Sequence, residues 1–173
     1  MYRWIAIISL ALVMTSCIFA PGLTDEGLDS SDIITRQETP WDVLANFRYA
    51  YKFADSLIYS DVLDSNFIFI SKNYATAPPT DIIWGRDVDI KTTMGMLRHF
   101  NVVELTWREG WDDPDNFDFV DSTKTNMKTT VTFQLTLDGG REIPTIKGEA
   151  FFEFALRARN IWRIVRWEDK SSF

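Results

Sequence analysis

Apolar and polar residues follow a helical period in the first part of the chain and a strand period in the last part. From residue 40 to residue 54, apolar side chains recur every three or four positions, as in a helix with one buried face. Thr39 supplies a capping hydroxyl, Pro40 suits the first helical position, and Asp42 places an acid in the first turn. A helix is therefore predicted from Pro40, with an apolar face made of Val43, Leu44, Phe47, Ala50, Tyr51 and Ala54.

Two further helices and two short strands are predicted before residue 101. Asp55 can cap a helix from Ser56 to Leu63, and Asp87 can cap another that ends near Phe100. The later helix would bury Ile90, Met94, Leu97 and Met96. Between these helices, residues 64–66 are typical of a turn, 67–71 and 82–84 of strands, and 74–80, with two adjacent prolines, of irregular structure.

From residue 103 onward the period is two, which is typical of strands with one buried face. Alternation is clear in residues 103–108, 130–137, 149–157 and 161–167. Asp138-Gly139-Gly140 is a hairpin turn signal, and Arg159-Asn160 marks a second turn. The whole pattern predicts an α+β domain in which three N-terminal helices pack on a mostly antiparallel sheet.

The first seventeen residues have the pattern of an export signal. Arg3 precedes an apolar run over residues 4–14, which is shorter than the about 20 residues of a membrane-spanning helix. The chain's single cysteine, Cys17, follows the small residues Thr15 and Ser16, and this segment resembles a bacterial lipobox. The resemblance implies that residues 1–16 are a lipoprotein signal peptide and that acyl chains such as palmitate on Cys17 anchor the chain to a membrane of the bacterial cell envelope. By resemblance to enterobacterial lipoprotein sorting, Ile18 after the cysteine implies the outer membrane. The simpler alternative is an ordinary signal peptide with an incidental cysteine.

Residues 17–38 have the composition of a charged spacer between that anchor and the domain predicted at 39–173. Five acids and one base lie between residues 18 and 38, among glycine, serine and proline. An acidic docking segment is the functional alternative to a spacer.

Overall composition narrows the class of partner. The chain has 173 residues, 46% of them apolar and 14% aromatic, which is enough for a well-packed core. Its formal charge of −7 argues against nucleic acid as a partner. One cysteine allows neither a disulfide framework nor a thiolate zinc cluster.

The predicted order of elements resembles the nuclear transport factor two-like superfamily. Three segments carry the resemblance: residues 40–47 in the first helix, 61–67 at the first strand, and the last hairpin, with 148–152 followed by 162–169. The resemblance implies a cystatin-like cone, in which a strongly curved sheet wraps a helix and leaves a pocket. The superfamily includes ketosteroid isomerase, scytalone dehydratase and many non-catalytic modules.

Neither enzyme's catalytic pattern is present. The isomerase carries a general-base aspartate near the end of its first strand, whereas residues 69–73 of this chain contain no carboxylate. Scytalone dehydratase relies on histidines with an aspartate, whereas this chain has only His99, whose position at a helix end is explained by the helix dipole.

The candidate pocket residues are aromatic. Tyr49 or Tyr51 is the nearest match to the isomerase's tyrosine on the first helix. The remaining candidates can be pocket lining or ordinary core. The candidate pocket residues are Tyr49, Tyr51, Phe53, Trp84, Trp107, Phe133 and Phe152.

Residues 111–118 are dense in acids and could hold calcium through oxygen ligands, but they lack the glycine and the terminal glutamate of an EF-hand loop. A solvated loop is the simpler interpretation. No metal or cofactor is expected.

Three functions are consistent with these patterns. The favoured one is a non-catalytic envelope lipoprotein that binds a small apolar ligand or a protein partner. The alternative is an isomerase-like or dehydratase-like envelope enzyme that uses Asp61, Asp64 or His99 with a pocket tyrosine, and a weaker option is an assembly module. A homodimer through the outer face of the sheet is a further hypothesis, because Thr130, Thr132, Gln134 and Thr136 form an uncharged polar row.

Overall fold

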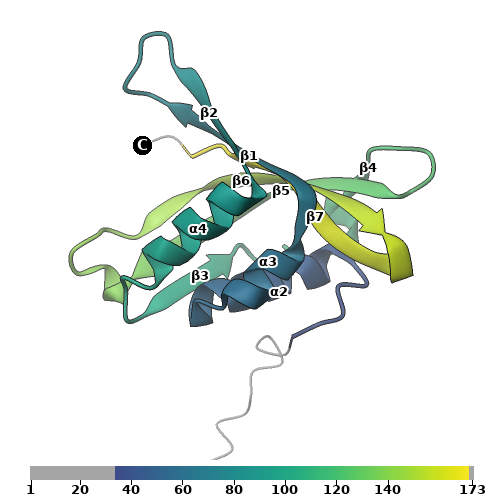
Figure 1. The fold of residues 1–173 in the computed structure, drawn as a ribbon, viewed down its shortest axis with the longest axis horizontal. Coiled ribbons are helices and arrows are strands. Elements are labelled where there is room, and N and C mark those ends of the chain that lie inside the picture. Colours follow the sequence, from purple (N-terminus) through teal and green to yellow (C-terminus); the bar gives the residue numbers. More distant parts are fainter. Residues whose placement is uncertain (1–33, 172–173) are drawn as a thin grey trace, which may run out of the picture. The chain divides into compact units, whose positions relative to one another are not determined.

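The computed structural model describes residues 34–171, which form three helices and a curved sheet (Figure 1). This content of helices and strands confirms the predicted α+β class. The helices are α2 (Pro40–Phe53), α3 (Ser56–Val62) and α4 (Arg86–Leu97). The strands are β1 (Leu63–Asn73), β2 (Thr80–Gly85), β3 (Val103–Trp107), β4 (Asp118–Phe119), β5 (Asn126–Leu137), β6 (Ile146–Arg157) and β7 (Ile161–Asp169). Among these residues, no helix has the length and apolar character needed to cross a membrane.

Helix α2 has the predicted start and the predicted buried face. The Thr39 hydroxyl accepts a hydrogen bond from the Asp42 amide at 3.2 Å, and the Asp42 carboxylate accepts one from the Thr39 amide at 3.0 Å. These two bonds form a capping box. The helix ends at Phe53, and the capping residue Ala54 adopts the left-handed conformation. Five of the six predicted face residues are buried: Val43, Leu44, Phe47, Ala50 and Tyr51.

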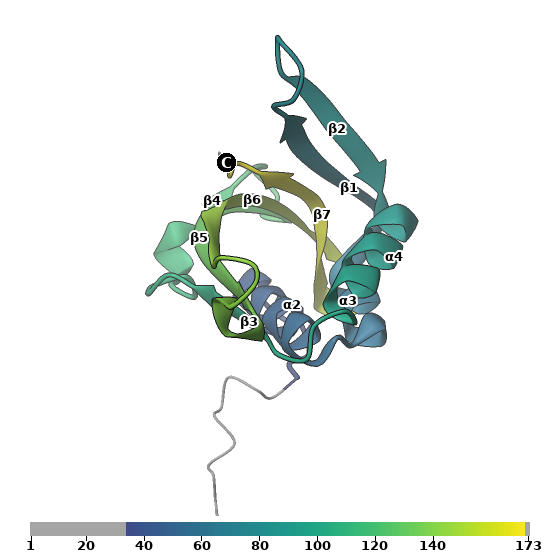
Figure 2. The same ribbon diagram turned by 90° about the vertical axis from the view of Figure 1, so that its left-hand side faces the viewer.

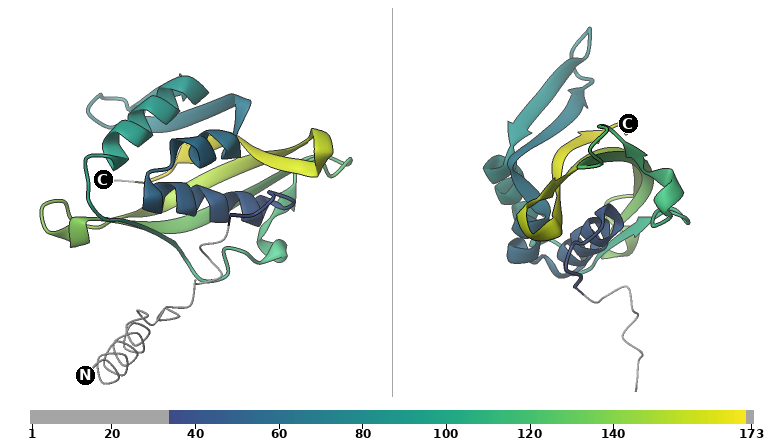
Figure 3. Two further views of the ribbon diagram at one scale, coloured as in Figure 1. Left: turned by 60° about the horizontal axis from the view of Figure 1, so that its bottom comes forward. Right: turned by 90° about the vertical axis from the view of Figure 1, so that its right-hand side faces the viewer.

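The strands form one sheet in the order β2-β1-β7-β6-β5-β3, and β4 pairs with β5 outside this path. Neighbouring strands run antiparallel, except that β1 and β7 run parallel. Figure 2 shows the sheet curving around α2, and Figure 3 shows the three helices along the same side of the sheet. The concave face of the sheet and the helices therefore enclose the core.

Helix α4 differs from the prediction at both ends. It begins at Arg86 with Gly85 as the capping residue, which provides no side-chain hydrogen bond, and Asp87 lies inside the first turn. The reason is that β2 continues to Gly85 and passes directly into the helix. At its other end the helix stops at Leu97 rather than near Phe100.

Strands β1 and β2 form a longer hairpin than the sequence predicts. Residues 64–66, predicted as a turn, belong to β1, and the pairing of β1 with β7 shifts between Leu63 and Ile68. The turn-forming residues therefore mark an irregularity inside a strand. The far end of the hairpin extends away from the helices (Figures 1 and 2). The short strand β4, which has only two residues, was not predicted.

Residues 34–38, which the sequence assigned to the spacer, pack against the domain. The Thr35 amide donates to Asn46 Oδ1 at 2.8 Å, and the buried Gln37 side chain donates to Asp61 Oδ2 at 2.6 Å. The Gln37 carbonyl also accepts a hydrogen bond from the Trp162 amide at 2.8 Å. The ordered domain therefore begins before Thr39. Cys17 and the predicted signal peptide lie outside the described residues.

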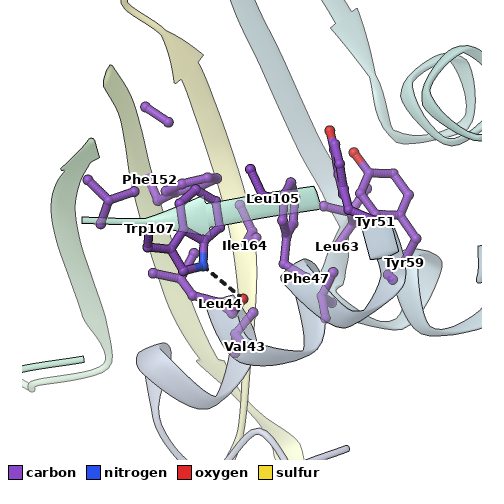
Figure 4. Packing of buried hydrophobic residues seen from close by; sticks show 14 of the residues in the cluster. Val43, Leu44, Phe47, Tyr51, Tyr59, Leu63, Leu105, Trp107, Phe152 and Ile164 are labelled. Atoms are coloured by element: carbon purple, nitrogen blue, oxygen red, sulfur yellow. Dashed lines mark hydrogen bonds between the residues drawn. The ribbon is translucent and has the colours of Figure 1, made fainter. Parts of the chain in front are cut away.

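The core is centred on Phe47, which is 1% exposed. Figure 4 shows its ring between Trp107 on one side and the two tyrosines Tyr51 and Tyr59 on the other. The Phe47 ring centroid lies 4.8 Å from that of Tyr51 and 6.0 Å from that of Trp107. The indole of Trp107 donates a hydrogen bond to the Leu44 carbonyl at 3.4 Å, which ties β3 to α2.

Candidate functional site

A cavity of about 260 Å³ lies between α2, α4 and the concave face of the sheet. This volume is slightly below the roughly 300–1,000 Å³ range of ligand pockets, so it suits a small molecule. Its walls are mainly aromatic and aliphatic. Eight aromatic side chains line it: Phe47, Tyr51, Phe69, Trp84, Trp107, Phe133, Phe152 and Trp167.

The cavity opens beside α4. Thr92 and Met96 both line the cavity and are both exposed to solvent. They are four residues apart and so lie on the same face of the helix. Leu135 on β5 and Ile146 on β6 also line the cavity, and Ile146 is partly exposed. We define the mouth of the cavity by Thr92 and Met96.

A buried carboxyl group stands in the cavity wall. Asp89 on α4 is 1% exposed. Its Oδ2 accepts a hydrogen bond from the Tyr59 hydroxyl at 2.6 Å, and its Oδ1 accepts one from the Trp84 indole at 2.9 Å. The ring centroid of Tyr51 lies 5.7 Å from that of Tyr59, and Figure 4 shows the two tyrosine hydroxyls pointing the same way. Thr93 also lines the cavity. We call Asp89, Tyr59, Trp84, Tyr51 and Thr93 the polar network.

Burial changes the acidity of this network. It raises the pKa of the Asp89 carboxyl, although hydrogen bonds from Trp84 and Tyr59 favour the ionised form and offset part of the increase. Burial also raises the pKa of both Tyr51 and Tyr59, so their hydroxyls keep their protons. Because folding makes Asp89 hold its proton more tightly, its contribution to stability is lost as pH rises through the folded-state pKa. A desolvated acid of this kind beside a cavity is typical of functional sites.

A second carboxyl group reaches the cavity from β7. The pairing of β6 with β7 shifts by one residue, because Glu153 pairs with Arg166 while Phe154 pairs with Ile164. This bulge places Trp167 and Asp169 opposite Phe152 and Ala150, whose side chains line the cavity. Trp167 and Asp169 therefore lie on the concave face.

The polar atoms of Asp169 and Trp167 differ in their hydrogen-bond partners. Asp169 Oδ1 accepts a hydrogen bond from the Ser171 amide at 2.9 Å. The indole N–H of Trp167 is buried and has no hydrogen-bond partner within residues 34–171. A buried donor without a partner has a cost that a ligand oxygen would remove.

The structure brings five of the seven predicted aromatic residues to the cavity and leaves two outside. Tyr51, Trp84, Trp107, Phe133 and Phe152 line it. Tyr49 and Phe53 do not; they lie four residues apart on the outer face of α2, and their ring centroids are 4.6 Å apart. Phe53 is 52% exposed. The helical period explains this placement, because the buried face of α2 runs through Phe47 and Tyr51.

None of the three acid–base residues that the enzyme hypothesis names lines the cavity. Asp61 is exposed and forms an ion pair with Arg163 at 2.6 Å. Asp64 is buried, but it lies at the start of β1 and pairs with Arg157 at 2.6 Å. His99 is exposed just after α4 and its ring contacts Phe100.

The acidic loop and the outer sheet face also lie outside the cavity. In the loop, Asp113 caps a short turn over Pro114–Asn116, and within residues 34–171 no group of three or more histidine, cysteine, aspartate or glutamate side chains is placed to hold a metal ion. On β5, Thr130, Thr132 and Gln134 are exposed, as expected for the outer face, and Thr136 is partly buried. The homodimer through this face stays a prediction.

Sequence reasoning missed both cavity carboxyl groups. Asp89 comes four residues before Thr93, and both lie on the buried side of α4 together with Leu97. An acid on the buried face of a helix is the signal that could have identified it. Asp169 could not have been found in this way, because its inward direction depends on the bulge in β7.

Comparison with known proteins identifies the fold. No family model matches the chain, and no curated protein matches it. Among solved structures, a putative scytalone dehydratase from Novosphingobium aromaticivorans is 13% identical, with a TM-score of 0.57 over 76% of this chain and 80% of that one. A domain of unknown function with a cystatin-like fold from Nostoc punctiforme is 12% identical, with a TM-score of 0.54 over 76% of this chain and 74% of that one.

A third similar structure, a conserved protein from Planctomyces limnophilus, is 14% identical, with a TM-score of 0.53 over 73% of this chain and 88% of that one. The structural similarity shows that the fold is shared. At sequence identities this low, it does not indicate a shared activity. The chain has the cone-shaped α+β fold of nuclear transport factor two-like, scytalone dehydratase-like and cystatin-like proteins.

Proposed function

We propose that the chain binds a small, mainly apolar molecule inside the cavity. The observation that carries the proposal is a cavity whose walls are aromatic and aliphatic and whose mouth is open to solvent beside Thr92 and Met96. Burying apolar surface there stabilises a complex by about 25 cal/mol per Å² before the cost of association. Polar groups at the wall, including the unpaired Trp167 indole, would orient the molecule.

Binding is favoured over catalysis by the way Asp89 is held. Both of its carboxylate oxygens already accept hydrogen bonds, from Tyr59 and Trp84. These two bonds favour the ionised form and fix the orientation of the group, so its remaining lone pairs are constant acceptors for a bound molecule, whereas a general base takes up a proton during the reaction. The three acid–base residues named by the enzyme hypothesis lie away from the cavity.

Closing the mouth tests the proposal. We expect 4-phenylbutan-1-ol to bind the full chain with a dissociation constant below about 1 mM, as measured by isothermal titration calorimetry. Thr92→Trp places a large ring at the mouth, so the affinity should fall at least about tenfold. The matched control is Val88→Trp, because Val88 is on the same helix, is 52% exposed and does not line the cavity.

The affinity of Val88→Trp should equal that of the unchanged chain. If Thr92→Trp binds the alcohol as tightly as Val88→Trp does, the alcohol does not enter the cavity through this mouth. Absence of binding to the unchanged chain would contradict the proposal itself.

We also propose that the chain is a lipoprotein of the bacterial cell envelope, anchored through Cys17. The support is the short apolar run before a single cysteine that follows two small residues. Two or more acyl chains make such an attachment durable, since each buried methylene contributes about 0.8 kcal/mol. The ligand-binding domain would then be held at a membrane surface.

Cys17→Ser tests the anchor. In a bacterial host fed labelled palmitate, the unchanged chain should be processed and labelled and should fractionate with membranes. The variant should accumulate as an unlabelled precursor. A variant that is still labelled and processed would show that Cys17 is not the attachment site.

A further inference from the structure

The charged groups that line the cavity all have the same sign. Among its seventeen lining residues, two are acidic, Asp89 on α4 and Asp169 on β7, and none is lysine, arginine or histidine. The two carboxyl groups come from different elements, a helix and a strand. A ligand inside therefore meets two carboxyl groups and no protein cation that could balance them.

The basic residues nearest to Asp169 along the chain are engaged outside the cavity. Arg166 pairs with Glu168 at 3.0 Å, and its guanidinium lies over the Phe151 ring. The Lys170 amine also lies over the Phe151 ring, 5.0 Å from its centroid. Neither Arg166, Lys170 nor Phe151 lines the cavity.

Both carboxyl groups keep acceptor capacity for a ligand. A carboxylate offers about four lone-pair positions. Asp89 uses one on each oxygen, for Tyr59 and Trp84. Asp169 uses one on Oδ1, for the Ser171 amide. A protonated amine carries several N–H donors and no acceptor, so it matches these positions in both charge and hydrogen bonding.

The aromatic walls favour the same kind of ligand. The faces of tryptophan, tyrosine and phenylalanine rings attract cations, most strongly where water is excluded. Trp84, Trp107 and Trp167 are all in the wall. The chain's formal charge of −7 adds a long-range attraction for cations and a repulsion for anions.

From this arrangement we propose that the ligand of the cavity is an organic cation: a protonated amine on an apolar or aromatic body, with its charge beside Asp89 and Asp169. The inference rests on the proposed function, since it specifies the chemistry of a ligand in the same cavity. It adds that a positive charge on the ligand increases its affinity.

Three probes that share one apolar body test the inference on the full chain by isothermal titration calorimetry at neutral pH. They are 4-phenylbutan-1-amine, which is a cation, 4-phenylbutan-1-ol, which is neutral, and 4-phenylbutanoate, which is an anion. The amine should bind at least about tenfold more tightly than the alcohol, and the anion more weakly than the alcohol.

Asp169→Asn should lower the affinity for the amine by about threefold or more and change the affinity for the alcohol by a smaller factor. Retained binding of the alcohol also shows that the variant is folded. The matched control is Asp87→Asn on α4, because the Asp87 side chain is 97% exposed and outside the cavity. This control should leave the affinity for the amine unchanged.

The outcomes separate the two proposals. If the alcohol binds as tightly as the amine, the cation inference is overturned while the proposed function stands. If Asp87→Asn weakens amine binding as much as Asp169→Asn does, net charge rather than the cavity explains the preference, and the inference is also overturned. If no probe binds, both proposals fail.

Discussion

Phe47→Ala should lower the free energy of unfolding by about 3–5 kcal/mol, because it removes the ring at the centre of the core. Phe47 is 1% exposed and its ring contacts five other aromatic rings, from α2, α3 and three strands. The cavity left behind would lie between rigid rings that cannot close in on it. Chemical denaturation followed by tryptophan fluorescence measures the change.

The matched control is Phe53→Ala on the same helix. Phe53 is 52% exposed, and its ring contacts Tyr49 and the Lys52 amine rather than the core. Removing the Phe53 ring should lower the free energy of unfolding by less than about 1 kcal/mol. A Phe47→Ala variant as stable as Phe53→Ala would contradict the packing described for the core.

Arg157→Met should destabilise the domain by about 2 kcal/mol at neutral pH, because it leaves a buried carboxylate without its cation. The Arg157 guanidinium donates to Asp64 Oδ2 at 2.6 Å, and the Asp64 side chain is only 5% exposed. Methionine keeps much of the apolar stem of arginine and removes the charge. The cost should remain below that of a fully buried pair, since the Arg157 side chain is 43% exposed.

The effect of Arg157→Met should depend on pH in a defined direction. Burial alone would raise the pKa of Asp64, but the hydrogen bond from Arg157 and the Asn66 amide outweigh it and lower that pKa. A lowered pKa gives stability that is complete above the unfolded-state value of about 4 and is lost as pH falls through the folded-state value. The difference in the free energy of unfolding between Arg157→Met and the unchanged chain should therefore become smaller at acidic pH.

Lys72→Met is the control for the arginine variant, because Lys72 pairs with Asp81 where both side chains are about half exposed. Its effect should be much smaller than that of Arg157→Met at neutral pH, because exposed ion pairs contribute little to stability. Equal losses from the two variants, or a loss from Arg157→Met that persists unchanged in acid, would contradict the role assigned to Asp64. Denaturant midpoints measured across the acid range provide the comparison.

Local signals in the sequence account for much of the fold. The capping residues Thr39 and Asp42 and the apolar spacing up to Tyr51 define α2 without any tertiary information. The alternation through Val131 and Leu135 likewise identifies a strand with one buried face. Where local preference and packing agree in this way, prediction from sequence succeeds.

The rest depends on interactions between distant segments. Asp87 has the chemistry of a capping residue, but the continuation of β2 to Gly85 moves the start of α4 and puts Asp87 inside the helix. The direction of Asp169 depends on a bulge formed only when β7 pairs with β6. Tyr49 and Tyr51 are both predicted pocket residues because both are tyrosines on the first helix. The helical period, however, places their side chains on different faces of that helix.

The cavity itself could be predicted only in part for the same reason. Aromatic residues such as Trp107 and Phe152 are expected inside a cone, but whether they enclose a space depends on the curvature of the sheet. Asp89 is not predicted to line the cavity, because acidic residues are rarely fully buried and are therefore assigned to the surface from sequence alone. Its burial is the feature that most clearly separates this cavity from an ordinary core.

A crystal structure of the full chain with 4-phenylbutan-1-ol would show directly whether the cavity is the binding site. We expect electron density for the phenyl ring among Trp84, Trp107 and Phe152, with the hydroxyl near Asp89 or Trp167. A cavity that stays empty at saturating alcohol, with the alcohol bound elsewhere on the surface, would contradict the claim that this cavity is the binding site.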